Sequence, residues 1–232
     1  MLPITNHLDE LIEYAKRLKR TYKPKGLIIA VAGLAASGKT TGAKALAQAF
    51  NLEYYSVGSI FREKAEKMGI SIEEFSTRRS DELDLEADKK ALERMMKGNV
   101  VIDGRVVGVL ASLLKPLEKS GKVAIVRILY KPPLEVRASR YAQKEGKPYE
   151  ISVEMVRSRD EADKGKYLAL YGVDITNPES YDIIIDNSGW SLEEAQTLPI
   201  ILVLSYLQKN NLTHLLKSKP SEYLEKLGYF AS

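Results

Sequence analysis

Residues 33–40 read Gly-Leu-Ala-Ala-Ser-Gly-Lys-Thr, and these residue types in this order are suited to holding phosphate groups. They fit the pattern G-x-x-x-x-G-K-[ST] and lie between an apolar run, 27–32, and an alanine-rich stretch, which is the strand-to-helix context that the motif requires. The small residues let backbone N–H groups curl around a phosphate, and the helix N-terminus adds partial positive charge. Lys39 would then reach the β- and γ-phosphates, and the Thr40 hydroxyl would bind Mg²⁺. The sequence therefore predicts a site for a nucleoside triphosphate.

The composition limits which chemistry can accompany this loop. The chain has 232 residues, no cysteine and only 2 histidines, His7 and His214, which both lie in the terminal segments. Disulfides, thiolate metal ligands and Ser-His or Cys-His nucleophiles are therefore excluded or nearly so. The net charge of +4 suits an anionic small molecule as well as nucleic acid, and decides neither. Central chemistry must depend on lysine, arginine, aspartate and backbone amides, which favours phosphate handling.

The sequence contains no segment that we expect to enter a membrane. Its first residues, MLPITNHLDELIEY, are acidic and lack the basic-then-apolar pattern of a signal peptide. The longest apolar run, 27–36, is about half of the ~20 residues that a membrane helix needs. We therefore expect a cytoplasmic protein without a membrane partner.

Apolar runs and helical stretches alternate along the chain. We expect strands at 27–32, 53–56, 99–103, 122–130 and 181–186, and helices at 39–50, 59–69, 72–98, 133–146 and 150–171. Several strands are near-continuous apolar runs, which suits a parallel sheet covered on both faces. This order predicts an α/β fold, doubly wound around a mostly parallel sheet of five strands.

The two ends of the chain are expected to be helical additions to this core. At the start, Leu8, Leu11, Ile12, Ala15 and Leu18 recur at helical spacing. We expect a helical extension and linker over 1–25, a core over 26–190, and C-terminal helices over 191–232, broken at Pro199 and Pro220. Packing on the core is the favoured role of the N-terminal helix. Assembly into a homo-oligomer through the terminal helices is a further possibility.

Cations gather in the later half of the chain. Arg137, Arg140 and Lys144 are spaced i, i+3, i+7 and share one helix face. Arg159, Asp163 and Lys166 are spaced i, i+4, i+7 on the next predicted helix, after a Gly146-Lys147-Pro148 break. Solvated charged helices would explain either group alone. Together they indicate a hinged basic lid over about 137–171 that closes on a transferring phosphoryl group. The chain has no Asn-Lys-x-Asp stretch of the kind that GTPases use to read guanine.

Longer segments resemble a known family. They read "YYSVGSIFREKAEKMGISIEEFS", "NVVIDGRVVGVLA", "PLEVRASRYAQKEGK" and "RSRDEADKGKYLALYGVDITNPESYDIIIDNS". In order and spacing, from about residue 27 to 205, the chain resembles the archaeal-type cytidylate kinases. The resemblance implies phosphoryl transfer from ATP to CMP or dCMP, with Mg²⁺.

The resemblance also implies roles for individual residues. ATP would contact Gly33, Ala36, Ser37, Gly38, Lys39, Thr40, Thr41 and Arg137. The transferring group would be stabilised by the catalytic residues Lys39, Arg140, Arg159 and Lys166. The acceptor nucleotide would contact Ser59, Arg62, Asp103, Arg105, Arg159 and Asp163, and the metal would be held by Thr40 and Asp103.

Three residues depart from the family pattern. Ala36 replaces a common glycine, which is tolerable if its φ is negative. Ser59 stands where the family usually has Asp or Glu, which weakens the assignment of the acceptor. Lys166 replaces a lid arginine and exchanges a forked donor for a point charge. Two alternatives stay open: a P-loop kinase for another acceptor, such as AMP, another nucleoside monophosphate or a sugar phosphate, and a nucleotide-dependent RNA-binding or regulatory protein. Nucleic acid is the less favoured partner, because the basic faces carry no clear row of stacking aromatic residues.

Overall fold

A parallel sheet of five strands forms the centre of the protein, as predicted. The structure, a computed structural model, describes residues 7–226. The strand order is β2-β3-β1-β4-β5, so the chain changes direction across the sheet at β1. The strands are β1 (Gly26–Gly33), β2 (Glu53–Ser56), β3 (Val100–Gly104), β4 (Val123–Tyr130) and β5 (Ile183–Ile185). Every residue of β1 and β3 is buried, because helices cover both faces of the sheet.

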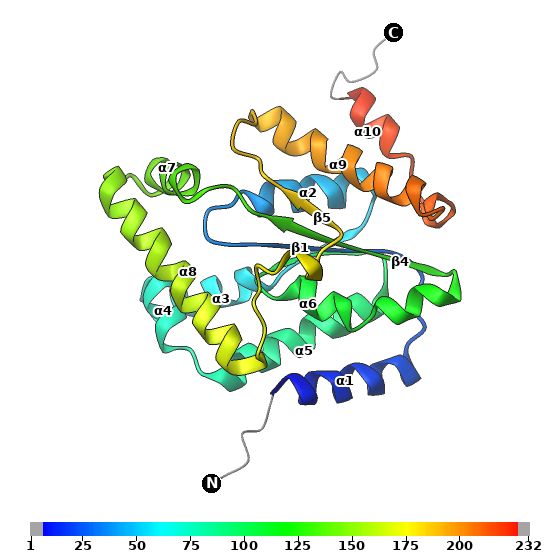
Figure 1. The fold of residues 1–232 in the computed structure, drawn as a ribbon, viewed down its shortest axis with the longest axis horizontal. Helices are drawn as coiled ribbons and strands as arrows, with labels where there is room; N and C mark the ends of the chain where they lie inside the picture. Colours follow the sequence, from blue (N-terminus) through cyan, green and yellow to red (C-terminus); the bar gives the residue numbers. More distant parts are fainter. Residues whose placement is uncertain (1–6, 227–232) are drawn as a thin grey trace.

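The helices form one layer on each face (Figure 1). Alternate side chains of β1 supply the two cores: Ile28, Ala30 and Ala32 face one, and Leu27, Ile29 and Val31 face the other. The layer on the second face contains α2 (Lys39–Ala49), α9 (Leu192–Lys209) and α10 (Pro220–Lys226). On the first face lie α1 (His7–Thr21), α3 (Val57–Lys67), α4 (Ile72–Arg78), α5 (Asp81–Lys97) and α6 (Val107–Ser112). Short 3₁₀ helices are η1 (Lys115–Ser120), η2 (Pro178–Ser180) and η3 (Thr213–Leu215).

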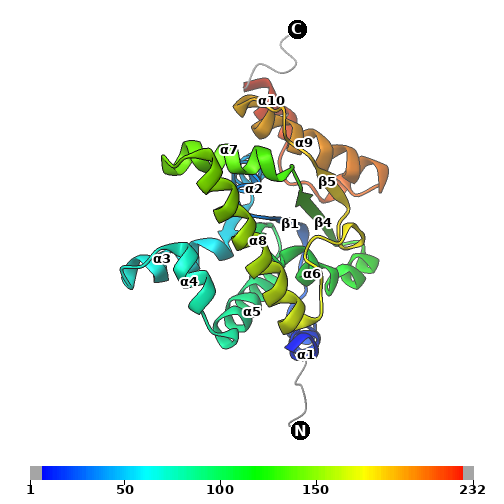
Figure 2. The same cartoon turned by 60° about the vertical axis from the view of Figure 1, so that its left-hand side comes forward.

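Two more helices project from the carboxyl end of the sheet. These are α7 (Leu134–Glu145) and α8 (Tyr149–Tyr171), at the positions expected for the lid. Gly146 ends α7 with φ 64°, a left-handed conformation that permits the sharp turn into α8. The two helices pack against each other, and α8 also packs against α4 (Figure 2).

The helix predicted over 72–98 is in fact two helices, and this prediction was wrong. The chain leaves α4 at Arg79, whose backbone is extended, and α5 begins after Ser80. The Ser80 side chain accepts a hydrogen bond from the Leu83 amide at 3.4 Å, and the first turn of α5 is acidic. This capped start makes a second helix N-terminus favourable. The helix expected to begin at residue 59 also starts earlier, at Val57.

The predicted break at Pro199 is wrong as well, whereas a new helix does begin at Pro220. Helix α9 continues through Pro199, which is buried and lies beside Gly42 of α2. Packing on α2 therefore outweighs the roughly 3 kcal/mol that an interior proline costs. Pro220 is the first residue of α10, where a missing N–H is of no consequence. The end of the C-terminal segment, 227–232, lies outside the described residues.

The amphipathic N-terminal helix is confirmed, and it packs on the core. Leu11, Ala15 and Leu18 of α1 are buried against the layer that contains α5. The Lys19 ammonium donates a hydrogen bond to the Leu113 carbonyl at 2.7 Å. Homo-oligomer assembly through the terminal helices stays a prediction.

Candidate active site

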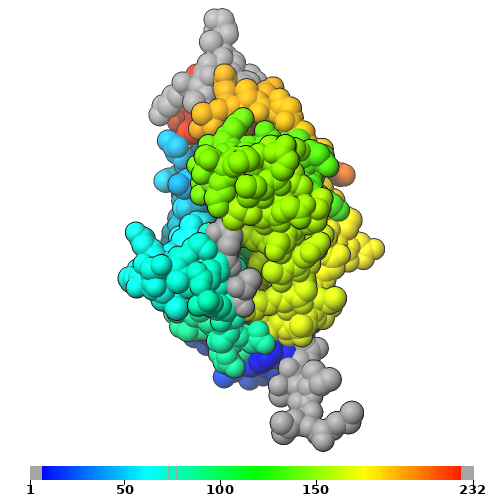
Figure 3. Space-filling model, turned by 90° about the vertical axis from the view of Figure 1, so that its left-hand side faces the viewer, coloured from blue at the N-terminus to red at the C-terminus, as the bar shows by residue number. Residues whose placement is uncertain are grey.

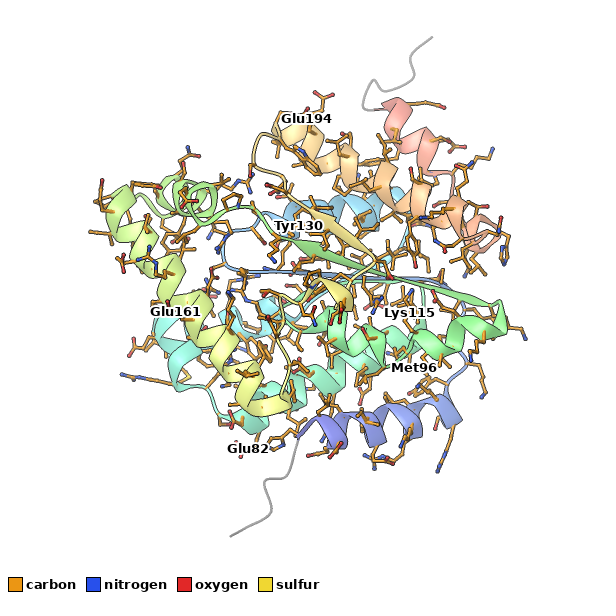
Figure 4. The ribbon with its side chains drawn as sticks, viewed as in Figure 1. Glu82, Met96, Lys115, Tyr130, Glu161 and Glu194 are labelled. Carbon is orange, nitrogen blue, oxygen red and sulfur yellow. The ribbon has the colours of Figure 1, made fainter. Side chains whose placement is uncertain are left out.

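The predicted phosphate loop connects β1 to α2. A Cβ on Gly33 would lie 2.6 Å from the Ser37 hydroxyl and 2.8 Å from the Tyr130 carbonyl oxygen, so only glycine fits there. Gly38 has φ 81°, the left-handed conformation that glycine adopts without strain. Tyr130, labelled in Figure 4 at the end of β4, supports the loop and places its hydroxyl where a Cβ on Gly42 would be.

Ala36 was expected to replace glycine without strain only if its φ angle were negative, and this condition is not met. Its φ is 54°, in the left-handed region that a Cβ disfavours by about 1–2 kcal/mol. The loop therefore keeps the glycine-like backbone shape in spite of the alanine.

Lys39 stands at the start of α2 among other cations. Burial and the charges of Arg105 and Arg159 lower the pKa of Lys39 to about 8, against the opposing effect of Asp103. So many positive charges in one place are favourable only if anionic groups join them. This electrostatic pattern fits the phosphates of a nucleotide.

A hydroxyl and a carboxylate meet beside the loop. The sheet register pairs Val31 with Asp103, which puts the carboxylate where β1 enters the loop. Thr40 donates a hydrogen bond to Asp103 at 2.7 Å, and the Tyr54 hydroxyl donates another at 2.9 Å. Hard oxygen donors of this kind, combined with phosphate oxygens, are what Mg²⁺ prefers. Within residues 7–226, no group of three or more His, Cys, Asp or Glu residues could hold a metal.

Arg137 supports the phosphate loop from behind. It is buried, forms an ion pair with Asp160 of α8, and donates a hydrogen bond to the Ala35 carbonyl at 3.2 Å. Asp160 also accepts a hydrogen bond from the Ala35 amide at 3.1 Å. Arg137 lines neither of the two cavities described below. Its contact with ATP stays a prediction, and the structure gives it a positioning role instead.

Arg140 reaches the loop through Asn187, which follows β5. Arg140 donates to the side-chain oxygen of Asn187 at 3.0 Å and to its carbonyl at 2.6 Å. The Asn187 amide group in turn donates to the Ser37 carbonyl at 3.2 Å. Because Asn187 is buried, this arrangement fixes both the loop and the α7 arginine.

Two cavities meet at the arginines between the loop and the lid. The outer cavity is lined by residues 35–41 of the loop and by Arg140, Lys144 and Glu145 of α7, among others. The inner cavity begins at Lys39, Thr40 and Asp103 and extends to Phe61 of α3 and to Ile72 and Ser76 of α4. Arg62, Arg105 and Arg159 line both. Two anionic ligands could therefore approach each other across these three cations.

Buried ion pairs form the wall of the inner cavity. Asp163 of α8 contacts Arg105 at 2.7 Å and Arg79 at 3.5 Å. Asp84 of α5 contacts Arg79 at 2.9 Å and Lys166 at 2.6 Å. Burial alone would raise the pKa of Asp163, but Arg105, Arg79, Arg159 and Lys39 together hold it below its usual value. Lys166 also lies 3.7 Å from Asp81, so three cations face three carboxylates in this cluster.

Most of the residues predicted from the sequence come together here. The cavities are lined by Lys39, Thr40, Thr41, Ala36, Ser37, Gly38, Arg62, Asp103, Arg105, Arg140, Arg159 and Asp163. Lys166 lines neither cavity and pairs with Asp84 instead. Ser59 is exposed, and its hydroxyl donates to the Ser56 carbonyl at 2.7 Å. The roles assigned to individual residues stay predictions.

Comparison with known proteins identifies the family. Residues 32–157 match a family model described as AAA domain. The cytidylate kinase of Methanopyrus kandleri is 37% identical over 170 residues, which cover 72% of this chain and 88% of that protein. The cytidylate kinase of Pyrococcus horikoshii is 38% identical over 169 residues, covering 72% and 83%. The chain belongs to the cytidylate kinase family. These matches favour neither alternative weighed from the sequence, another acceptor or an RNA-binding protein.

Solved structures show the same fold. An uncharacterized protein from Eubacterium ventriosum superposes with a TM-score of 0.53 at 18% identity, covering 78% of this chain and 98% of that one. Shikimate kinase from Acinetobacter baumannii, in complex with shikimate, gives a TM-score of 0.50 at 15% identity, covering 83% and 98%. These similarities concern the α/β architecture alone. Across the described residues, none of the helices has the length and apolar character to span a bilayer.

Several residues at the kinase site were not found by sequence reasoning. Tyr54 and Asn187 were not among the site residues predicted from the sequence. Arg79, Asp84 and Asp160 were not singled out. The one signal available was the spacing of Asp84 and Asp88 on the buried face of α5, because buried carboxylates require partners. The partners themselves lie far away in the sequence.

Proposed function

We propose that this chain transfers the γ-phosphoryl group of ATP to CMP or dCMP, giving ADP and the nucleoside diphosphate. The observation that supports this most directly is the convergence of Arg62, Arg105 and Arg159 between a phosphate loop and a second cavity. Membership of the cytidylate kinase family supports the choice of acceptor. We also propose that the protein acts on free nucleotides in the cytoplasm.

The loop would hold the donor. Backbone amides of residues 34–38 and the start of α2 would bind the β- and γ-phosphates, and Lys39 would neutralise the migrating group. Thr40 and Asp103, joined at 2.7 Å, would hold Mg²⁺ directly or through its water molecules. The metal, when bound, supplies charge neutralisation across the β- and γ-phosphates.

The arginines would align the acceptor. An acceptor phosphate is already ionised and needs no general base, so positioning and charge neutralisation are sufficient. Arg62 of α3 and Arg105 after β3 would hold that phosphate, and Arg159 of α8 would approach the group in transfer. Helices α7 and α8 would exclude water, which would otherwise hydrolyse ATP.

Release of ADP in the presence of ATP and Mg²⁺ tests this function. The acceptors to compare are CMP, dCMP, UMP, AMP, GMP and dTMP, together with a sugar phosphate as an acceptor of a different chemical class. We expect the highest kcat/KM with CMP or dCMP. Phosphorylation of the sugar phosphate alone would contradict the cytidylate assignment and leave the kinase assignment standing. RNA binding that falls steeply with salt, without any phosphorylation, would contradict both.

A further inference from the structure

We propose that Asp160 is a positioning residue for the donor site: together with Arg137 it holds the backbone of Ala35 and so keeps Ala36 in the left-handed conformation. This inference deepens the proposed function and rests on it, because it concerns the loop that would bind the phosphates of ATP. The described walls of the inner and outer cavities include neither Asp160 nor Arg137, so both residues act on the loop and not on the ligand.

Both polar backbone groups of Ala35 are bonded to side chains of the lid helices. The Ala35 N–H group donates to the Asp160 carboxylate at 3.1 Å, and the Ala35 carbonyl accepts from Nη1 of Arg137 at 3.2 Å. Arg137 also forms the ion pair with Asp160 and donates through Nε to the Pro132 carbonyl at 3.1 Å. The guanidinium is therefore fixed on several sides, and it fixes the Ala35 carbonyl in turn.

The ion pair is shielded from water. It joins α7 to α8, which form much of one face of the molecule (Figure 3), and the side chains of Arg137 and Asp160 are 7% and 8% exposed. Beside it, Ala35 packs against Tyr141 and Val156. A hydrogen bond lost in such surroundings is not replaced by one to water, so these contacts influence the loop more than surface contacts would.

The Ala35 carbonyl connects the ion pair to the conformation of Ala36. This carbonyl and the Ala36 nitrogen belong to the same planar peptide group, so the direction of the carbonyl depends on the φ of Ala36. A change from the observed 54° to the usual negative range would turn the carbonyl away from Arg137. A residue with a Cβ disfavours the left-handed region by about five- to thirtyfold in population. The contacts with Arg137 and Asp160 offset this preference.

The conformation of Ala36 matters for an anionic ligand. The carbonyls on either side of it, of Ala35 and Ser37, are bonded to Arg137 and to Asn187, which is buried. These carbonyl oxygens are thus turned toward the protein, and the amides of the loop are left for the phosphates. A left-handed residue in such a turn brings successive N–H groups to one side and makes an anion-binding concavity. If Ala36 left this conformation, the Ala35 oxygen would be free to turn toward a phosphate and repel it.

The experiment measures the binding of ADP with Mg²⁺ by calorimetry, without an acceptor. It compares the wild-type chain, Asp160→Asn, Ala36→Gly and the double variant. Asparagine keeps the size of the side chain but removes the charge that binds Arg137, so we expect the Kd for ADP to rise about tenfold. Glycine adopts positive φ about as readily as negative φ. In Ala36→Gly and in the double variant the Kd should therefore lie within about threefold of the wild-type value.

A second variant tests the other half of the ion pair. Arg137→Lys keeps a cation beside Asp160 but lacks the planar fork that reaches the Ala35 carbonyl. It should weaken ADP binding in the same way and recover in the same way when Ala36→Gly is added. Because it keeps the buried charge paired, it remains informative if Asp160→Asn fails to fold.

Asp182→Asn is the matched control. Asp182 also accepts a backbone N–H, from Arg127 at 2.9 Å, and pairs with the Arg127 guanidinium at 2.8 Å. It belongs to the described wall of neither cavity and makes no printed contact with the loop among the described residues. This substitution should lower the melting temperature and leave the Kd for ADP unchanged, with or without Ala36→Gly.

Each outcome decides the inference. Weaker binding in Asp160→Asn or Arg137→Lys that recovers with Ala36→Gly supports it. Unchanged binding in these variants, or a loss that persists after Ala36→Gly is added, would overturn it, and phosphorylation of CMP by the wild-type chain would still uphold the proposed function. The expected pattern of ADP binding in a chain that phosphorylates no nucleoside monophosphate would support the inference about the loop and overturn the proposed function.

Discussion

The two ends of the active site are built in different ways. The loop end uses consecutive residues, 33–41, whose shape depends on backbone conformation and on glycines that leave no room for a Cβ. The inner end uses side chains from α3, α4, α5 and α8 and from the residue after β3, held together by buried ion pairs.

Because of this difference, substitutions are expected to impair the two ends of the site in different ways. Backbone amides cannot be removed by substitution, so the loop end is sensitive mainly through Lys39 and through added bulk. At the inner end every group is a removable side chain, and removing one leaves a buried charge without its partner. Selectivity and stability are therefore expected to change together at the inner end, and separately at the loop end.

The largest effect is expected from Lys39→Met. Loss of the charge that stabilises the migrating phosphoryl group should reduce kcat by about 10²–10³-fold or more. The melting temperature should change little, because Lys39 makes no ion pair that supports the fold within the described residues. Steady-state kinetics with a thermal melt as control checks both parts. Near-normal turnover in the folded variant would contradict the assignment of this loop as the phosphate-binding loop.

Arg62→Ala should act on the acceptor. A charge-assisted hydrogen bond of about 1.5–3 kcal/mol corresponds to a ten- to hundredfold rise in the KM for CMP. The KM for ATP should change far less. The double variant with Arg105→Ala should be less than additive, because both arginines would hold one phosphate. Full additivity, or a larger effect on ATP than on CMP, would mean that the acceptor site is elsewhere.

Removal of residues 1–22 should affect stability more than turnover. The deletion exposes the surface that Leu11, Ala15 and Leu18 cover, which we expect to lower the free energy of unfolding by about 2–3 kcal/mol. No residue of α1 lines the inner or the outer cavity. Denaturant unfolding and kcat measured on the same sample check this. A folded truncation without activity would show that the extension contributes to the site.

The smallest effect on turnover is expected from Asp88→Asn, which should change stability in a way that depends on pH. Burial raises the pKa of Asp88 to about 8, although the hydrogen bond from the Tyr171 hydroxyl opposes this. The unfolded chain ionises near the ordinary value of 3.8, so between about pH 4 and 8 the folded chain binds more protons and its stability falls as pH rises. Asparagine should remove this decline, about 1 kcal/mol per pH unit, and stabilise the protein at pH 8. Parallel pH profiles of the two proteins would show the prediction to be wrong.

The contrast between the two ends also explains what could be predicted from the sequence. The residues of the loop motif are consecutive, and the strand and helix beside it are its neighbours in the sequence. The position of the loop and the order of the core elements could therefore be predicted directly from the sequence. The helix break after Arg79 was missed because residues 76–82, STRRSDE, contain no glycine or proline, and only the Ser80 cap marks the new start.

The ion pairs of the inner end could not be predicted for a different reason. Arg79 and Asp163 are 84 residues apart in the chain, and Arg137 meets Ala35 across 102 residues. A charged residue on a helix gives no local indication of its partner, so Lys166 and Arg137 were expected to face ligand rather than to bind carboxylates. The continuation of α9 through Pro199 could not be predicted for the same reason, since it depends on packing against α2.

One guanidinium spans both ends of the site. Arg105 donates to the Gly33 carbonyl at 2.7 Å through Nη1 and contacts Asp163 at 2.7 Å through Nε. A ligand that pulls Arg105 away from either partner would change the environment of the other, so we expect the two nucleotides to affect each other's binding. Thermodynamic reciprocity then requires that the factor by which ATP alters the affinity for CMP equals the factor by which CMP alters the affinity for ATP. The side chain of Arg105 would thus couple the donor site to the acceptor site.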